Sequence, residues 1–322
     1  MAVKWGVLGT ANIARWCTIP GMKGADNCEL YAIAGRNPEK VEKYKEEFGF
    51  VKGYTGYDKL LEDHDVQAVY IPLPNDLHKE WVIKALRAGK NVLCEKPLAL
   101  NAADAEEMYA VARENNVILM EAYAYLHSPY IASLKEDLAS GIIGDVDYLE
   151  TEFLTQGYIE DYRLYRDKGG GAIYDLGCYC TTMILSLFDG DPELVFAAAE
   201  FLETGVDAFA SVLVRVGNVR ASFNAGMNFT PGCNSRKDKL YIHGSKGVIN
   251  SDVEYNQAGE LKYTITADGK IIERTVSAMQ NYTLEAEQLG RCIENGETPH
   301  ISPEFSIKNA KLLDAILQRI GY

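Results

Sequence analysis

The sequence predicts an α/β domain with a doubly wound parallel sheet, followed by an α+β domain built on an open-faced, mostly antiparallel sheet. Strand-like and helix-like runs alternate from Val3 to about Tyr123, which is typical of parallel strands joined by helical crossovers. From Val146 onward, long strand-like runs follow one another through turn signals without intervening helices. Two helix-like runs, residues 282–295 and 303–320, close the chain.

The composition is that of an ordinary globular protein, with 322 residues of which 47% are hydrophobic and 24% are charged. The formal net charge of −14 argues against nucleic acid as a partner, because binding phosphates requires a basic face. No run approaches the roughly 18 apolar residues of a membrane span, and the strand-like run at Val3 leaves no room for a signal peptide. We therefore expect a cytoplasmic protein that does not bind membranes.

The cysteines and histidines indicate reduced thiols and no structural metal. The seven cysteines are odd in number and contain no Cys-x-x-Cys pair, and Cys178 and Cys180 form the only close pair. The five histidines lack the spacing of a zinc site. Thiols of this kind are expected in a reducing compartment.

The first strand-like run, Trp5–Leu8, leads into a version of the G-x-G-x-x-G dinucleotide turn, written here G-x-A-x-x-A. Gly9 keeps the tight turn, Ala11 narrows the gap between backbone and pyrophosphate without closing it, and Ala14 is small enough to pack helix against strand. The candidate cofactor-binding residues of this turn are Gly9, Thr10, Ala11, Asn12 and Ile13. A strand, turn and helix without a ligand is the alternative.

The second strand-like run, Leu30–Ala34, ends in Gly35-Arg36-Asn37-Pro38 and precedes a helix over 39–48. Domains that bind NAD carry an acid at this point for the ribose 2′-hydroxyl, whereas an arginine suits the 2′-phosphate of NADP. Arg36 can form a bidentate contact with that phosphate and stack on the adenine. We expect NADP rather than NAD, and the alternative is a solvated arginine in a turn.

The third strand-like run, Val66–Leu73, is followed by Pro74-Asn75-Asp76-Leu77-His78 and a helix over 79–88. Prolines keep the chain extended here, which leaves Asn75 and His78 near the sheet edge where ligands bind. The candidate cofactor-binding residues of this segment are Leu73, Pro74, Asn75 and His78. His78 could instead only cap the helix.

The stretch Asn91–Pro97 reads as a short buried strand, Val92–Cys94, with an acid and a base at its carboxyl end. Ligands of open α/β sheets bind at that end, so Glu95 and Lys96 are candidate ligand contacts. The alternative is a surface pair between the two side chains. One more unit follows, a helix over 102–114 and a strand over 117–121.

The second half begins with a helix over 131–140, and seven strand-like runs follow: 146–154, 195–202, 208–216, 219–227, 240–242, 261–266 and 271–276. Gly217-Asn218 and Asp268-Gly269 are typical of hairpin turns. These runs predict one sheet with one face that no element of the same chain covers. A homodimer, or a dimer of dimers, is the simplest way to cover that face.

Three glycines, Gly169–Gly171, precede a run that contains Asp175 and Tyr179. If the glycines open a helix, these two side chains stand at i and i+4 on one face. Glycines also permit close approach of the backbone to a cofactor or a neighbouring helix. The alternative is a loop before a buried helix whose tyrosine packs in the core.

These motifs together resemble the glucose-fructose oxidoreductase / inositol dehydrogenase / rhizopine-catabolism (Gfo/Idh/MocA) family over essentially the whole chain. The resemblance rests on the order and spacing of five segments: Gly9–Ala14, Pro74–His78, Glu95–Pro97, Glu121–Tyr123 and Gly169–Tyr179. Tyrosine at position 179, where inositol dehydrogenases have histidine, resembles the branch of dimeric dihydrodiol dehydrogenases and NADP-dependent D-xylose dehydrogenases.

The resemblance implies a Rossmann domain over residues 1–123, a substrate-binding and dimerisation domain over 124–284, and helices over about 285–322 that return to the first domain. It implies catalytic roles for Lys96, Tyr179 and Asp175, which would bind the substrate together with Arg163. The implied activity is that of an NADP-dependent sugar dehydrogenase. Such an enzyme transfers a hydride between the nicotinamide and a hydroxyl or carbonyl carbon of a sugar, polyol or cyclic diol.

Elementary chemistry agrees with these roles. Oxidation of an alcohol removes a proton while hydride leaves, and Tyr179 can take that proton if the Lys96 ammonium lowers its pKa from about 10. Asp175 would orient the lysine or hold a second substrate hydroxyl. Which of Lys96 and Tyr179 carries the proton stays open, because coupled groups share a titration. A regulatory protein that binds the nicotinamide nucleotide without turnover is the alternative function.

Overall fold

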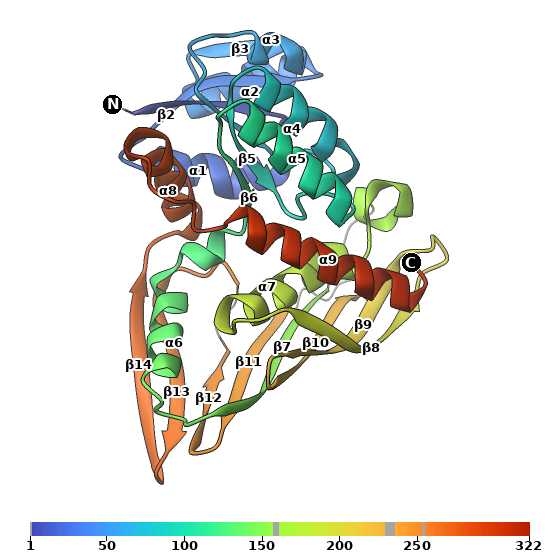
Figure 1. Ribbon diagram of the computed structural model, residues 1–322. Coiled ribbons are helices and arrows are strands. Elements are labelled where there is room, and N and C mark those ends of the chain that lie inside the picture. The colour runs from blue at the N-terminus through green and yellow to red at the C-terminus, as the bar shows by residue number, and fades with distance from the viewer. Residues whose placement is uncertain (1, 157–160, 229–235, 253–254) are drawn as a thin grey trace. The chain divides into compact units, whose positions relative to one another are not determined.

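The computed structural model describes residues 2–156, 161–228, 236–252 and 255–322, and contacts within the chain divide it into two compact units. Unit 1 comprises residues 1–127 and 280–307, and unit 2 comprises residues 128–279 and 308–322. The last helix, α9 (Pro303–Ile320), therefore contributes its first residues to unit 1 and the others to unit 2. Each unit is built on a sheet of its own (Figure 1).

Unit 1 contains a six-stranded sheet in the order β3-β2-β1-β4-β5-β6, in which every neighbouring pair is parallel. This is the strand order of doubly wound dinucleotide-binding domains, and it confirms the predicted fold class of the first half. The short edge strand β3 has no counterpart among the predicted runs. The strands are β1 (Val3–Leu8), β2 (Cys28–Gly35), β3 (Lys52–Thr55), β4 (Ala68–Ile71), β5 (Asn91–Glu95) and β6 (Leu119–Ala122).

Local signals explain where the helices of unit 1 begin and end. The Asn37 side chain accepts a hydrogen bond from the Lys40 N–H (3.0 Å) at the start of α2, and Gly49 ends that helix with a left-handed φ of 82°. Asn101 caps α5 in the same way. The helices are α1 (Ile19–Lys23), α2 (Pro38–Phe48), α3 (Tyr57–Leu61), α4 (His78–Arg87), α5 (Ala102–Glu114) and α8 (Asn281–Asn295).

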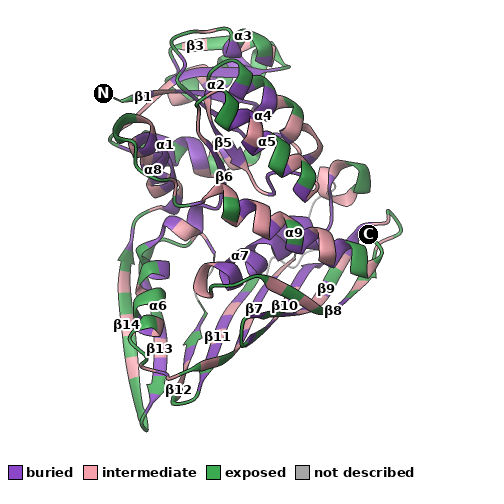
Figure 2. Cartoon of the chain, viewed as in Figure 1, coloured by how far each residue is buried: buried purple, intermediate pink, exposed green. Residues whose placement is uncertain are grey.

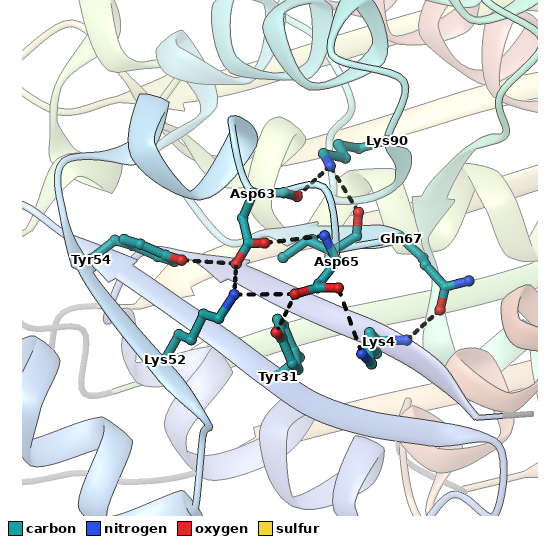
Figure 3. A network of polar contacts seen from close by, with 9 residues as sticks. Lys4, Tyr31, Lys52, Tyr54, Asp63, Asp65, Gln67 and Lys90 are labelled. Atoms are coloured by element: carbon teal, nitrogen blue, oxygen red, sulfur yellow. Dashed lines mark hydrogen bonds and ion pairs between the residues drawn. The ribbon is translucent and has the colours of Figure 1, made fainter.

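A polar network stabilises the edge of this sheet where the strands begin (Figure 3). Asp63 accepts hydrogen bonds from Tyr54 (2.8 Å) and Lys52 (2.9 Å), and Asp65 accepts one from Tyr31 (2.7 Å). These contacts tie β2 and β3 to the segment before β4. The two carboxylates and the Lys52 ammonium therefore pair with one another within the fold.

Unit 2 contains an eight-stranded sheet in the order β14-β13-β12-β11-β7-β10-β9-β8. All neighbours are antiparallel except β7 and β10, which are parallel, so the predicted mostly antiparallel sheet is confirmed. Both predicted hairpin turns are present, while β12 has no counterpart among the predicted runs. The strands are β7 (Val146–Gln156), β8 (Pro192–Phe201), β9 (Asp207–Val216), β10 (Val219–Asn228), β11 (Arg236–Gly244), β12 (Gly247–Ser251), β13 (Gly259–Ala267) and β14 (Lys270–Ala278).

One face of this sheet is buried and the other is open. Leu149 on β7 is fully buried, and α6 (Pro129–Ala139) and α7 (Cys178–Leu187) pack against the sheet, α7 being buried along most of its length (Figure 2). The open face carries polar cross-strand contacts on its central strands, where Lys239 donates to Glu150 (2.6 Å). This alternation confirms the open-faced sheet that the sequence predicts.

None of the helices in the described ranges combines the length and the apolar character needed to span a membrane. The six cysteines within those ranges are free thiols, and Cys233 lies outside them. No cluster of three or more potential metal-ligating side chains occurs among the described residues.

Candidate functional site

The turn after β1 has the backbone that a dinucleotide site requires. Gly9 has a φ of 124°, which favours glycine, and a Cβ at this position would lie 3.1 Å from a methyl carbon of Leu73. The Gly9 N–H donates to the Ala34 carbonyl (2.8 Å), and the Tyr44 hydroxyl donates to the Thr10 carbonyl (3.1 Å). Contacts from β2 and α2 therefore fix the first half of the turn.

A helix begins within the same turn. The Arg15 N–H bonds to the Ala11 carbonyl (3.1 Å), and a π-helical turn, Ala14–Thr18, leads into α1. The backbone N–H groups of Asn12 and Ile13 belong to the first helical turn, where such groups lack partners within the helix and can bind a phosphate. The predicted residues thus fit the pyrophosphate of a dinucleotide, because a glycine turn and helical N–H donors stand together.

Arg36 follows β2 at the carboxyl edge of the sheet. It is exposed, and its neighbour Asn37 caps α2, so the side chain starts from a fixed backbone. Burial raises the pKa of the Tyr57 phenol, and the nearby positive charge of Arg36 opposes part of that rise. An exposed guanidinium at this point can bind a phosphate group.

The segment after β4 directs two predicted residues into the protein. Asn75 and His78 are buried, and a short 3₁₀ turn precedes α4. The two ring nitrogens of His78 face the carbonyl oxygens of Leu73 and Pro97, each at 2.8 Å. Burial lowers the pKa of His78 although these contacts oppose the change. His78 therefore joins the loop after β4 to the loop after β5.

Glu95 and Lys96 stand at the end of β5, as the sequence predicts. The Glu95 carboxylate accepts a hydrogen bond from the buried Tyr70 hydroxyl (2.6 Å), which in turn accepts one from Thr18 (2.8 Å). Lys96 is half-buried, and its backbone N–H donates to Glu95 (3.3 Å). The chain from Thr18 through Tyr70 to Glu95 fixes the strand end from which Lys96 projects.

In unit 2 the structure brings Arg163 and Asp175 together. Arg163 Nε lies 3.0 Å from Asp175 Oδ2, and Arg163 Nη1 lies 2.7 Å from Asp161 Oδ2. Asp175 is only 8% exposed. The guanidinium therefore compensates a carboxylate that is largely removed from water.

The glycines before this helix allow the backbone to pack closely. A Cβ on Gly170 would lie 2.2 Å from the Arg163 carbonyl oxygen, and a Cβ on Gly171 would lie 2.0 Å from Asp207 Oδ1. Asp207 in turn accepts a hydrogen bond from the Ile173 N–H (2.7 Å) at the start of the helix. Burial raises the pKa of Asp207 to about 7, which the bond from Ile173 only partly offsets. Glycine is required at both positions because any side chain would force the turn and the helix apart.

Tyr179 lies on the helix that follows. The chain passes through a π-helical turn, Ile173–Gly177, before α7 begins, and such turns are frequent at functional sites. Tyr179 is 9% exposed, and its ring contacts Phe153 and Tyr255, with ring centroids 5.3 Å and 5.2 Å away. The ring therefore packs among aromatic side chains, while the hydroxyl lies 3.4 Å from the amide nitrogen of Asn256.

The predicted site residues fall into two groups. Unit 1 contains Gly9, Thr10, Ala11, Asn12, Ile13, Arg36, Leu73, Pro74, Asn75, His78, Glu95 and Lys96, and unit 2 contains Arg163, Asp175 and Tyr179. Sequence reasoning missed the side chains that support the second group, which are Phe153, Asp207, Arg236, Asp238, Tyr255 and Asn256. For Asn256 the residue type was a usable signal, because asparagine is enriched in turns with a positive φ. The structure gives Asn256 a φ of 62°. Phe153, Asp207, Arg236 and Asp238 depend on which strands are neighbours, and Tyr255 depends on how the segment between β12 and β13 packs.

Two family models match the chain. The model described as an oxidoreductase family with an NAD-binding Rossmann fold matches residues 3–123, and the GFO/IDH/MocA C-terminal domain matches residues 131–250. These matches confirm the predicted Rossmann fold and the predicted nicotinamide cofactor.

Several known proteins are similar to the chain over its full length. The trans-1,2-dihydrobenzene-1,2-diol dehydrogenase of Xenopus tropicalis is 31% identical over 336 residues, which cover 100% of this chain and 99% of that protein. A D-xylose 1-dehydrogenase (NADP(+)) of Haloferax volcanii is 32% identical over 330 residues, 98% of this chain and 97% of the relative. The structure of a 3-ketoreductase from Actinomadura kijaniata in complex with NADP and TDP-benzene matches with a TM-score of 0.93 at 30% identity, covering 99% of this chain and 98% of that one.

The similarity covers both halves of the chain. The relatives are dehydrogenases and reductases, which confirms the predicted enzyme class, a nicotinamide-dependent dehydrogenase acting on CH–OH groups. From its two family matches and its full-length relatives, this chain belongs to the Gfo/Idh/MocA family of oxidoreductases.

Proposed function

We propose that this enzyme uses NADP to transfer a hydride between the nicotinamide and a hydroxyl or carbonyl carbon of a sugar, polyol or cyclic diol. The observation that carries the proposal is the group on one helix of unit 2, where Asp175 pairs with Arg163 and the Tyr179 ring is held in an aromatic cluster. A protein that only bound the nucleotide would not need this group. The relatives support the substrate class, because their names specify a cyclic diol, D-xylose and a ketone.

In this proposal unit 1 binds the cofactor and unit 2 binds the substrate. The backbone N–H groups at Asn12 and Ile13 bind the pyrophosphate, and Arg36 binds the ribose 2′-phosphate. The cofactor, when bound, accepts or donates the hydride at its nicotinamide ring. The other proposed cofactor contacts are Gly9, Thr10, Ala11, Leu73, Pro74, Asn75, His78, Glu95 and Lys96.

The proton of the reacting hydroxyl passes to Tyr179 or Lys96. A C–H hydrogen leaves the substrate as hydride while the O–H hydrogen leaves as a proton, so the product carbonyl is neutral. Arg163 and Asp175 lie within ion-pair distance, so the guanidinium offers donors and the carboxylate offers acceptors to neutral hydroxyl groups. We propose that this pair orients the hydroxyl groups next to the reacting carbon.

Initial rates of the purified enzyme with aldoses, polyols, inositols and trans-dihydrodiols, measured with NADP and with NAD, test the proposal. We expect turnover with one of these substrate classes, and we expect Lys96→Met and Tyr179→Phe to abolish it while NADPH binding is kept. Lys59→Met, on the exposed side of α3, is the matched control for the lysine. Full activity in both variants would refute the assigned roles, and tight NADPH binding without turnover would favour a regulatory protein.

The preference for NADP is tested at Arg36. Two charge-assisted hydrogen bonds to a 2′-phosphate would be lost in Arg36→Ala. We expect the Kd for NADPH to rise about tenfold or more, which corresponds to about 1.4 kcal/mol, and the Kd for NADH to stay the same. An equal change in both Kd values would show that Arg36 does not bind the 2′-phosphate.

We also propose that the open face of the unit 2 sheet pairs with a second copy of the chain. Phe196 on β8 and Phe209 on β9 are 51% and 36% exposed, and exposed aromatic side chains on a sheet face indicate an interface. Light scattering should give the mass of a dimer or a tetramer. Phe196→Glu should lower that mass, and a monomeric wild-type enzyme at micromolar concentration would contradict the proposal.

We propose the cytoplasm as the compartment, because every cysteine among the described residues is a free thiol. Titration of thiols in freshly isolated, denatured enzyme should find them all reactive. Blocked thiols would contradict a reducing location.

A further inference from the structure

The segment between β12 and β13 brings an amide to the Tyr179 hydroxyl. Asn256 Nδ2 lies 3.4 Å from Tyr179 Oη, and Asn256 has a φ of 62°, in the left-handed region that asparagine tolerates better than most residues. We propose that Asn256 is a positioning residue, whose amide N–H donates to Tyr179 Oη and directs the hydroxyl proton toward the substrate. The inference rests on the proposed function, in which Tyr179 exchanges a proton with the substrate.

An ion pair at the start of β11 holds this segment in place. Arg236 Nε and Nη2 donate to the two carboxylate oxygens of Asp238, at 2.9 Å and 2.6 Å. The same two side chains hold the backbone of Tyr255: Asp238 accepts from its N–H (2.6 Å), and Arg236 donates to its carbonyl (2.9 Å). The Asp238 side chain is 1% exposed, so water does not compete for these bonds. Because Asn256 follows Tyr255 directly in the chain, these bonds also fix the backbone from which the Asn256 side chain extends.

Aromatic neighbours hold the Tyr179 ring in place. Its neighbours are Phe153, in an edge-on contact, and Tyr255, whose hydroxyl is hydrogen-bonded to Thr151 (2.8 Å). The Arg236 guanidinium lies over the Phe153 ring, 4.4 Å from its centroid. The ion pair between Arg236 and Asp238 therefore holds the segment that carries Asn256 and also supports the aromatic cluster around Tyr179. Asn256 and Tyr179, the two partners of the contact, are thus held by the same group of side chains.

The direction of the hydrogen bond gives this contact a chemical consequence. An amide N–H can only donate, so it cannot take up the phenol proton, which stays available for the substrate oxygen. A phenolate accepts a stronger hydrogen bond than a phenol does, so the contact favours the ionised form of Tyr179. Glycine would allow the same backbone without a donor, and aspartate would supply an acceptor in place of the donor.

Two substitutions distinguish the effect of the side-chain amide from the effect of the backbone conformation. Asn256→Gly keeps the left-handed conformation and removes the donor, and Asn256→Asp replaces the donor by an acceptor of almost the same size. Asn116 in unit 1 is exposed and also has a positive φ, 52°, so Asn116→Gly and Asn116→Asp are matched controls. The pH dependence of kcat/KM for alcohol oxidation is measured for all five proteins. Ionisation of Tyr179 is followed separately by NMR of ¹³Cζ-labelled tyrosine, with its resonance assigned through Tyr179→Phe.

In Asn256→Asp we expect the acidic limb of the pH profile to move up by one unit or more, so kcat/KM falls about tenfold at pH 7 and recovers at high pH. Asn256→Gly should move the limb in the same direction by less, and the Asn116 variants should not move it. Loss of activity by the same factor at every pH would indicate a purely structural role and overturn the inference. An unmoved profile together with an unmoved Tyr179 titration in Asn256→Asp would also overturn it, since the amide oxygen would then face the hydroxyl. A shifted Tyr179 titration in a protein without turnover would support the contact and refute the proposed function.

Discussion

Glu121→Gln should make the stability of unit 1 less dependent on pH. Glu121 lies on β6, is 2% exposed, and accepts a hydrogen bond from the Leu98 N–H (2.8 Å) in the loop after Lys96. Burial raises the pKa of this carboxyl from its ordinary 4.5 to about 7, and hydrogen bonds from Ser306 and Leu98 offset only part of the rise. The charged form is therefore disfavoured in the folded protein.

The two pKa values of Glu121 set the size of the effect. They differ by about 2.5, and at about 1.4 kcal/mol per pH unit this is worth about 3 kcal/mol. Because the folded protein binds the proton more tightly than the unfolded chain, this contribution is complete below pH 4.5. It declines between pH 4.5 and 7 and is absent above that range. Glutamine is neutral at every pH and keeps an acceptor for the Leu98 N–H.

We therefore expect Glu121→Gln and the wild type to be about equally stable near pH 4.5, and the variant to be more stable by up to about 3 kcal/mol at pH 8. Urea unfolding followed by tryptophan fluorescence measures this, because the three tryptophans, Trp5, Trp16 and Trp81, all belong to unit 1. Glu114→Gln, at the exposed end of α5, is the control. If Glu121→Gln and the wild type lost stability equally between pH 5 and 8, the reasoning would be refuted.

Three further substitutions test other parts of the structure. Asp137→Asn should destabilise unit 2 by about 2 kcal/mol at pH 7, because Arg274 bonds to both carboxylate oxygens (2.9 and 2.7 Å). Burial raises the pKa of Asp137, but the bonds from Arg274 outweigh burial and lower the pKa overall. The difference in unfolding free energy between the wild type and Asp137→Asn, measured by urea unfolding, should therefore shrink below about pH 4. Burial lowers the pKa of His127 from 6.5 to about 3, so wild-type stability should fall as the pH drops below 6.5, and His127→Gln should reduce that loss in fluorescence-monitored urea unfolding. Gly170→Ala places a methyl group 2.2 Å from the Arg163 carbonyl oxygen and should lower kcat/KM about tenfold or more, a change that steady-state kinetics would detect.

Most elements of the fold could be predicted because their signals are local. The helix Ala102–Glu114 has its predicted bounds, since Asn101 supplies the cap and the apolar spacing supplies the buried face. The strand Lys52–Thr55 escaped prediction because it is four residues long, lies at the sheet edge and alternates between half-buried and exposed positions. Gly247–Ser251 escaped for a similar reason, being a five-residue strand that begins with glycine.

Spacing and the family resemblance pointed to Asp175, in the π-helical turn before α7, and to Tyr179 on α7, but neither identified the partners of these two residues. Asp175 and Tyr179 stand four residues apart, which a helix brings to one side. The contact between Arg163 and Asp175 requires the backbone to pack closely at the glycines, a property of the folded turn that no periodicity predicts. His78 illustrates the opposite case, because its position was predicted while its inward direction was not.

The surroundings of Tyr179 are set by strand register, and this is why sequence reasoning could not find them. Phe153 on β7 stands directly opposite Asp238 on β11, so the aromatic cluster and the ion pair share the buried face of the sheet. A shift of one residue in this register would turn Asp238 to the open face and leave the Tyr255 backbone without its acceptor. The sequence contains each residue, but only the pairing of β7 with β11 turns them into one assembly. The proton chemistry proposed for Tyr179 therefore depends on a long-range register as much as on the tyrosine itself.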